Sequence, residues 1–293
     1  MAGRTHVVKR NGRALRVVEG GDPAGVPVVV HHGTPGSALL YAPDEADAVE
    51  RGVRLISYER PGYGGSGPQR GRNVADAAAD VAAIADTRGF ERFGTYGASG
   101  GGAHVLACAA LLPERVVGAV AIASVAPFDA EGLDWLAGAG QSNVDEIAAA
   151  KEGREALERF TTKERDEMIA ADPGVMVDAI RSLVSPPDAA ALSGKLGEHM
   201  LRSIREAISR SVEGWIDDDF ALLAPWGFEL DAIRVPVLLW HGEQDLFVPI
   251  AHGRWLAERI PGVDARFEPD HGHVSLVTRV PDVHAWLVER FQA

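Results

Sequence analysis

The sequence predicts an α/β fold in which a mostly parallel sheet is buried between two layers of helices. Three observations favour this class. Continuous apolar runs, such as residues 26–30 and 116–122, suit strands that are buried on both faces. These runs alternate with helical stretches as far as residue 125. The chain has 293 residues, of which 46% are hydrophobic, enough for one large core and an inserted subdomain.

The first third of the chain provides the opening strands. Residues 5–10 and 14–21 flank Asn11-Gly12, a two-residue signal for a hairpin. Residues 26–33 form an unbroken apolar run that ends in polar residues, and residues 53–60 form another. The stretch 37–52 between them favours a helix, although Pro43 interrupts the pattern.

A strand–turn–helix unit comes next. Asn73 can cap a helix over 74–89 that ends at Gly89. A strand over 92–98 leads directly to Ser99, a helix follows it, and residues 116–125 form a further buried strand.

The alternation then stops, and residues 127–228 predict a helical insertion. Three stretches in it are helical: 143–160, where Asn143 and Glu146 have the spacing of a capping box; 172–185, with Asp172 as cap and Pro173 in the first turn; and 197–215. Strands and helices resume at 235–245, 251–260, 264–273 and 281–291. We therefore divide the chain into a core, 1–126 with 229–293, and an inserted segment, 127–228.

Composition excludes several classes of function. The net charge of −13 and the pI near 5.2 disfavour nucleic-acid binding, because an acidic surface repels phosphates. No secretory signal or membrane-spanning run is evident, so a cytoplasmic protein without a membrane partner is expected. The single cysteine, Cys108, lies in an apolar helical stretch and is expected to be a small core residue.

Ser99 lies in Gly97-Ala98-Ser99-Gly100-Gly101, between a predicted strand and a predicted helix. This is the context in which Gly-x-Ser-x-Gly forms a nucleophile elbow, a sharp turn that leaves no room for side chains at the two glycines. A serine hydroxyl needs a base, and the base needs an orienting carboxylate. The ends of the later strands supply candidates in the order serine, aspartate, histidine, which accompanies this elbow.

Five motifs at strand ends then resemble those of the α/β-hydrolase superfamily, over essentially the whole chain. They are HHGTPG (31–36), RPGYGGS (60–66), GASGG (97–101), HGEQDLFVP (241–249) and HGHVS (271–275). The resemblance implies an eight-stranded sheet and a helical cap between the sixth and seventh strands. Through HGTPG the chain looks most like the esterases and proline iminopeptidases of that superfamily.

The resemblance implies a catalytic triad. Ser99 matches the nucleophile, Asp245 the acid of the Gly-x-x-Asp pattern, and His273 the base. Glu243 and Asp129 are the alternative acids, and His271 is the alternative base.

It also implies an oxyanion hole, the pair of backbone N–H groups that binds the developing oxyanion. Gly100 supplies one N–H. Thr34 supplies the other, because Pro35 has none. His32 and Gly33 are expected to support this loop.

Other features receive structural interpretations. Arg60 is expected to brace its own loop, and the acid run 217–219 to be a solvated cap face or a helix start. The scattered histidines favour no metal site, and no cofactor is implied. The candidates for the pocket lining are apolar residues of the insertion: Phe128, Trp135, Trp215, Met168 and Met176.

These observations predict a cofactor-free serine hydrolase that acts on small apolar esters, with a small molecule as its partner and a homodimer left open. An aminopeptidase, a C–C bond hydrolase, a lactonase and a non-catalytic ligand receptor are the alternatives. An aminopeptidase needs buried carboxylates for its substrate's ammonium group. Most acids of the insertion stand among Lys and Arg, apart from Glu213 beside Trp215, so an ester is expected to be the better substrate.

Overall fold

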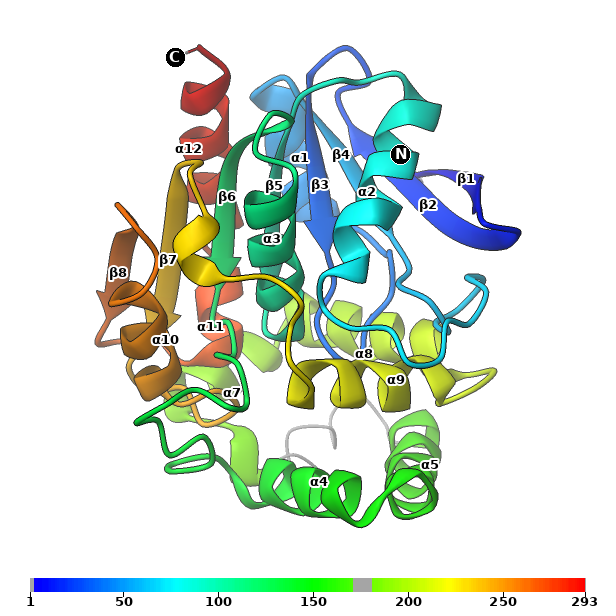
Figure 1. Cartoon of the computed structure of the whole chain (residues 1–293), viewed down its shortest axis with the longest axis vertical. Coiled ribbons are helices and arrows are strands. Elements are labelled where there is room, and N and C mark those ends of the chain that lie inside the picture. The colour runs from blue at the N-terminus through cyan, green and yellow to red at the C-terminus, as the bar shows by residue number, and fades with distance from the viewer. Residues whose placement is uncertain (1–2, 171–180, 293) are drawn as a thin grey trace.

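A single eight-stranded sheet forms the centre of the molecule in a computed structural model that describes residues 3–170 and 181–292 (Figure 1). The strand order is β1-β2-β4-β3-β5-β6-β7-β8. Strand β2 pairs antiparallel with β1 and β4, and the remaining neighbours are parallel. This confirms the predicted sheet. The strands are β1 (Arg4–Arg10), β2 (Arg13–Gly21), β3 (Val26–His31), β4 (Val53–Tyr58), β5 (Phe93–Ala98), β6 (Val116–Ile122), β7 (Val237–Gly242) and β8 (Asp264–Glu268).

Helices cover both faces of the sheet, because its central strands are apolar on both sides. Every residue of β6 and β7 is buried. Helices α1 (Ala42–Glu50) and α12 (Val280–Gln292) pack on one face, while α2 (Asp76–Arg88), α3 (Gly100–Leu111) and α10 (Ile250–Ala257) pack on the other. The short helix α11 (His273–Val277) follows β8.

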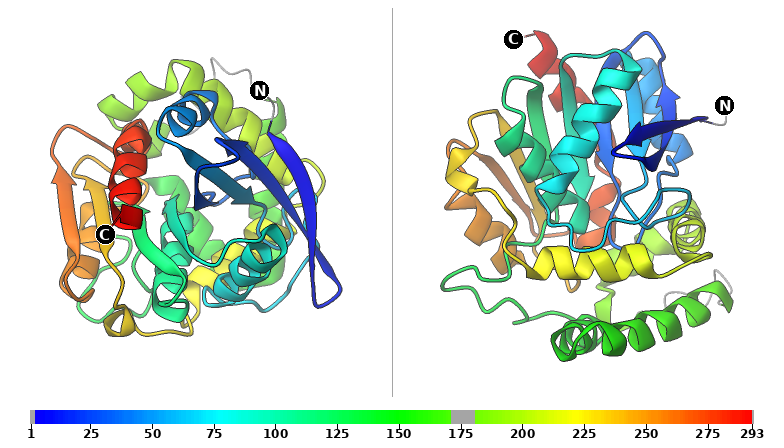
Figure 2. Two further views of the ribbon diagram at one scale, coloured as in Figure 1. Left: turned by 90° about the horizontal axis from the view of Figure 1, so that it is seen from above. Right: turned by 45° about the vertical axis from the view of Figure 1, so that its right-hand side comes forward.

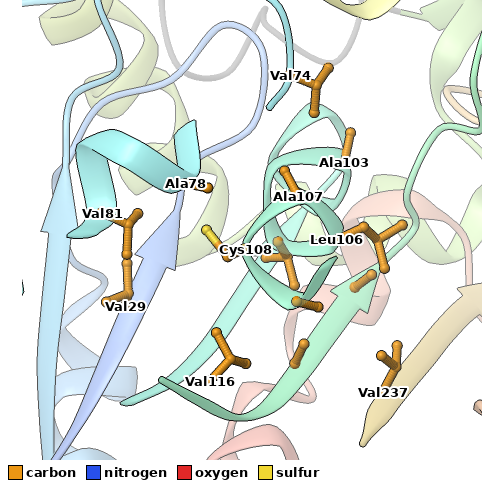
Figure 3. Packing of buried hydrophobic residues seen from close by; sticks show 14 of the residues in the cluster. Val29, Val74, Ala78, Val81, Ala103, Leu106, Ala107, Cys108, Val116 and Val237 are labelled. Atoms are coloured by element: carbon orange, nitrogen blue, oxygen red, sulfur yellow. The ribbon is translucent and has the colours of Figure 1, made fainter. Parts of the chain in front are cut away.

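The core beneath α3 is built from small and branched side chains. Leu106 and Cys108 of α3 are fully buried and belong to one cluster with Val29 and Val81 (Figure 3). Burial raises the pKa of the Cys108 thiol, which favours the unreactive protonated form. The cysteine is therefore a core residue, as its sequence context predicts.

The chain between β6 and β7, residues 123–236, is the inserted segment. Its described helices form a layer beyond the carboxyl ends of the parallel strands (Figures 1 and 2). The helices of this layer are α4 (Gln141–Glu152), α5 (Arg154–Ala170), η1 (Arg181–Leu183), α7 (Pro186–Leu192), α8 (Lys195–Ile208) and α9 (Glu213–Leu223). The short helix η2 (Leu230–Ala232) lies outside the layer and packs against α3 beside the sheet (Figure 1).

Two of the predicted helical stretches in this segment are wrong in extent. Residues 143–160 are two helices, because Gly153 adopts φ +119 and ends α4. Helix α4 begins after Gly140, so Asn143 is not its cap; the Asn143 side chain donates to the Phe247 carbonyl instead. Residues 197–215 likewise divide between α8 and α9. The predicted cap at Asp172 and Pro173 and the candidate Met176 lie outside the described residues.

No helix in the described parts of the chain is both long and apolar enough to cross a membrane.

Candidate active site

The strand order reverses between β3 and β5, which places the loops after these strands side by side. The chain leaves β3 towards β4 on one side, whereas β5 pairs with β3 on the other, with His31 opposite Gly97. The carboxyl end of such a reversal is where open α/β sheets bind ligands. The loop that contains Thr34 and the turn at Ser99 both begin here.

Ser99 occupies a sharp turn between β5 and α3. Its φ of +57 lies in the left-handed region, which is unusual for a residue with a side chain. A Cβ on Gly97 would approach the Gly101 carbonyl oxygen to 2.8 Å, and a Cβ on Gly101 would approach the His31 carbonyl oxygen to 2.5 Å. The two glycines are thus required by close backbone contacts, as the elbow motif predicts.

His273 and Asp245 come together from the ends of β8 and β7. His273 Nδ1 lies 2.7 Å from Asp245 Oδ2, and a carboxylate can only accept, so Nδ1 carries the proton and Nε2 is free to accept one. The other carboxylate oxygen of Asp245 accepts from the N–H groups of Phe247, at 2.9 Å, and Val248, at 2.8 Å. These bonds fix the orientation of the acid and, through it, of the imidazole.

Electrostatics favours a charged Asp245 and a basic His273. Burial alone would raise the pKa of Asp245, but His273 and His241 outweigh it and hold that pKa below its usual range. Burial alone would lower the pKa of His273, but the neighbouring carboxylate of Asp245 outweighs it and raises that pKa above its ordinary value. The pair therefore stabilises an imidazolium ion.

The alternative acids and base lie elsewhere. Glu243 is exposed at the surface and pairs with Arg254 at 3.1 Å, and Asp129 is exposed. His271 makes no described contact with Asp245, whereas His273 does.

The loop after β3 approaches Ser99. A Cβ on Gly33 would lie 3.7 Å from the Ser99 Cβ, and a Cβ on Gly100 would lie 2.5 Å from Thr34 Oγ1. Gly100 is the first residue of α3, so its N–H has no acceptor within the helix, and the positive end of the helix dipole lies at this point. Thr34 and Gly100 thus lie together beside Ser99.

Hydrogen bonds from His32 and Arg60 stabilise the loop that contains Thr34. The Arg60 N–H donates to His32 Nε2 at 3.1 Å, and His32 Nδ1 donates to the Gly33 carbonyl at 2.7 Å. Burial and the charge of Arg60 lower the pKa of His32 well below its ordinary value, which keeps it neutral, as these bonds require. The Arg60 guanidinium donates to the His32 and Gly33 carbonyls. Arg60 therefore braces the Thr34 loop, in addition to the loop in which it stands.

The acid run 217–219 is buried within α9, so its interpretation as a solvated face or a helix start is wrong. Asp218 accepts from Arg60, Arg72, Tyr63 and Thr34, at distances of 2.6 to 3.1 Å. Burial would raise the pKa of Asp218, but Arg60 and Arg72 hold it far below its usual range. Asp218 thereby joins the inserted segment to the loop beside Ser99. The apolar residues around the run, Ile216 and Phe220 to Leu222, were the available sign of burial.

Asp188 is a second buried carboxylate that the sequence did not reveal. It lies in α7 of the inserted segment and is fully buried. Its oxygens accept from the backbone N–H groups of His273, at 2.9 Å, and Ser275, at 2.8 Å, and from the Ser185 hydroxyl at 3.0 Å. The two backbone partners, His273 and Ser275, lie 85 and 87 residues away in sequence, so no local pattern could indicate them.

Two cavities meet at Ser99 and His273, which line both. The first has a volume of about 230 Å³, and Trp135, Met168 and Trp215 are among its walls, as predicted. Phe128 is not among them; it packs against Trp135 with the ring centroids 5.4 Å apart. The second cavity, of about 210 Å³, lies towards α1 and α8.

The walls of the first cavity also include acidic residues, which the sequence analysis did not expect. Glu146 and Asp219 line it among the apolar walls. Glu213, the acid that stood out in the sequence, is instead paired with Arg70 at 2.8 Å and Arg154 at 2.6 Å.

Comparison with known proteins agrees with this geometry. The family model described as the alpha/beta hydrolase fold matches residues 26–143. The esterase RhEst1 from Rhodococcus sp. ECU1013 superposes with a TM-score of 0.70 at 24% identity, over 98% of both chains. The chain is an α/β-hydrolase-fold protein. The enol-lactonase from Burkholderia xenovorans LB400 also superposes on this chain, with a TM-score of 0.67 at 20% identity, over 99% of this chain and 100% of that one.

A curated relative shows that the likeness extends to sequence. A non-heme chloroperoxidase of Streptomyces lividans is 28% identical to this chain over 253 residues, which cover 84% of this chain and 83% of that protein. The proteins that resemble this chain thus include esterase, lactonase and haloperoxidase types. Among its described residues, no group of three or more His, Cys, Asp or Glu side chains is arranged to hold a metal ion.

Proposed function

We propose that this α/β hydrolase is a serine carboxylesterase, with Ser99 as nucleophile, His273 as base and Asp245 as the orienting acid. The observation that carries the proposal is the 2.7 Å contact between His273 Nδ1 and Asp245, at a cavity that Ser99 also lines. The inserted helices act as the cap over this cavity. Esterases among the structural relatives support the same assignment.

Each residue has one task in the proposed reaction. The Ser99 oxygen forms a bond to the ester carbonyl carbon while its proton moves to His273 Nε2. The oxyanion that develops is bound by the N–H groups of Thr34 and Gly100. His273 then gives the proton to the departing alkoxide as the C–O bond breaks. A water molecule resolves the acyl-enzyme by the same proton route, and Asp245 stabilises the imidazolium in both halves.

The two cavities support an ester as substrate. An ester has one substituent on each side of its carboxyl group, and Ser99 and His273 line two cavities that could each take one of them. An alkoxide or phenoxide leaves more readily than an amide nitrogen, so an ester demands less of the site. A lactone, with its substituents joined in one ring, is the nearest alternative.

The reaction class is tested by steady-state kcat/KM on one preparation, with short aryl esters, a γ-lactone and a prolyl arylamide. We expect aryl esters to turn over repeatedly and faster than the other two. A single turnover with retained product would instead indicate a ligand receptor, and a faster lactone or amide would reassign the substrate class.

The nucleophile is tested by a fluorophosphonate probe and mass spectrometry. The probe should form its adduct on Ser99, and Ser99→Ala should lose both labelling and nearly all turnover. Ser193→Ala is the matched control, because Ser193 is exposed on the inserted segment and lines neither cavity. An adduct on another residue, or wild-type turnover in Ser99→Ala, would overturn the proposal.

A further inference from the structure

A buried pair of carboxyl groups lies in the wall of the first cavity. Glu146 of α4 and Asp219 of α9 line the cavity that also contains Ser99. Their side chains are hydrogen-bonded to each other, and Trp215 Nε1 donates to Glu146 Oε1 at 2.5 Å. Burial raises the pKa of Glu146 to about 7, although its hydrogen bonds with Trp215 and Asp219 act in the opposite direction. Burial, and then the neighbouring Glu146, raise the pKa of Asp219 well above its ordinary value. The pair therefore retains a proton at neutral pH.

The pair is not fully satisfied by the protein. Asp219 is 6% exposed, and among the described residues its Oδ2 is buried without a hydrogen-bond partner. The cation that acts on Asp219, Arg72, is already bound to Asp218 at 2.6 Å and lies 3.9 Å from Asp217. A buried acceptor without a partner costs free energy, which a donor brought by a ligand would recover.

The charges on the cavity walls also favour a cationic ligand. Its described walls contain four carboxyl groups, those of Glu146, Glu164, Glu167 and Asp219, and no Lys or Arg. The two outer acids are paired with Lys163, at 3.4 and 2.9 Å, which leaves the inner pair as the free acceptor. Trp215 and Phe160 provide aromatic surface beside it, a surface that attracts cations.

We propose that this cavity binds a protonated amine carried by the substrate, with the ammonium N–H groups donating to Glu146 and Asp219. The inference names the class of substrate for the proposed ester hydrolysis. The reaction itself rests on the proposed function, whereas binding of the amine does not. An anionic substituent would meet only acids here, and a neutral apolar one would leave the Asp219 oxygen unpaired. A quaternary ammonium carries the positive charge but has no N–H group, so it would attract the two acids without donating a hydrogen bond to them.

Binding of two matched probes tests the inference without any turnover. 2-Phenylethylamine and 2-phenylethanol have the same shape and differ in the charged donor. By titration calorimetry at pH 7.5 we expect the amine to bind the wild-type protein about tenfold more tightly or better, since hydrogen bonds to charged groups are the strong ones. The amine should also compete with an aryl ester, which locates it in the catalytic cavity.

Charge-removing variants make the test specific. Because the two acids share one proton, either of them alone could keep the negative charge, so Asp219→Asn and Glu146→Gln combined in one double variant should reduce the amine preference to about twofold or less. Both replace an acid that burial already disfavours in its charged form, so folding is not expected to suffer. Glu152→Gln is the matched control, because Glu152 lies exposed on α4 outside the cavity and should leave the preference unchanged.

Equal affinity of amine and alcohol for the wild-type protein would overturn the inference, and so would an amine preference that survives in the double variant. If a variant does not fold, the wild-type comparison still decides. A protein that prefers the amine but hydrolyses no ester would refute the proposed reaction alone, and an esterase without the preference would refute this inference alone.

Discussion

At the scale of the residue, His273 is distinguished from His271 by one contact. Only Gly272 separates them in sequence, but His273 alone places Nδ1 against Asp245 among the described contacts. Its ring also stacks on Phe247, with the centroids 4.7 Å apart, which restricts the imidazole further. The proton-accepting nitrogen is therefore held in one orientation before a substrate arrives.

The first prediction compares these two histidines. His273→Ala should lower kcat on an aryl ester by a factor on the order of 10⁴ or more, because members of a triad act as a unit. His271→Ala should change kcat by less than about threefold, since surface substitutions are usually mild. The measurement is steady-state kinetics on both variants, and the opposite ranking would move the base to His271.

The second prediction concerns pH. Only the neutral form of His273 accepts the Ser99 proton, so activity is present above its pKa and is lost below it. Because Asp245 outweighs burial and raises that pKa above the ordinary 6.5, the acid limb of kcat/KM should have its inflection above pH 6.5. A pH profile with an inflection below 6 would contradict this.

At the scale of the element, helix α7 of the inserted segment holds the backbone of helix α11 of the core. Asp188 receives the first N–H groups of α11, which places a negative charge at a helix N-terminus, the favourable end of the dipole. His273 is the first residue of that helix. The position of the base therefore depends on an element from the other part of the chain.

The third prediction follows from this arrangement. In Asp188→Asn the amide oxygen can still accept from one backbone N–H, but the amide NH₂ would face the other N–H, and two donors cannot form a hydrogen bond. His273 should therefore shift, and kcat should fall by up to about 100-fold. The charge of Asp188 also raises the pKa of His273, so the acid limb should move to lower pH, a change that misplacement alone would not produce. Asp270→Asn, exposed in the preceding loop, is the control and should leave both unchanged. If the acid limb of the pH profile does not move in Asp188→Asn, the expected effect of the Asp188 charge on His273 is refuted.

The elements show what local sequence can and cannot predict. The turn at Ser99 was predictable because its glycines, its strand and its helix are contiguous in sequence. Asp245 and His273 were predictable because each follows a strand in a motif that resembles those of α/β hydrolases. The helix boundaries near Gly153 were not, because a glycine inside a helical pattern is often tolerated. Asp188 and Asp218 were missed for another reason: their partners are distant in the chain, and an acid in sequence shows its charge but not its burial.

At the scale of the whole molecule, Asp218 is the ionic centre that joins the inserted segment to the core. It comes from α9, while Arg60 and Arg72 come from the loops after β4 and before α2. All three are almost completely buried. Removing one member of such a group leaves the others charged and unpaired.

The fourth prediction measures this junction. Asp218→Asn should lower the free energy of unfolding by about 3 kcal/mol or more, because two buried guanidinium groups lose their counter-charge. Urea denaturation followed by circular dichroism provides the measurement. Asp134→Asn, exposed on the same inserted segment, should change it by less than about 0.5 kcal/mol. Equal stability of the two variants would show that the ionic centre contributes nothing net.

The contact between Asp188 and α11 has a consequence for protein engineering. Exchange of whole inserted segments between relatives is an obvious route to new substrate ranges in this fold. In this protein such a chimaera would remove Ser185 and Asp188 together with the pocket walls, and His273, the proposed base, would lose the acceptor for its own backbone N–H. A transplanted segment should therefore retain residues 185–188 of the host, so that a change of specificity is not mistaken for a failure of the base.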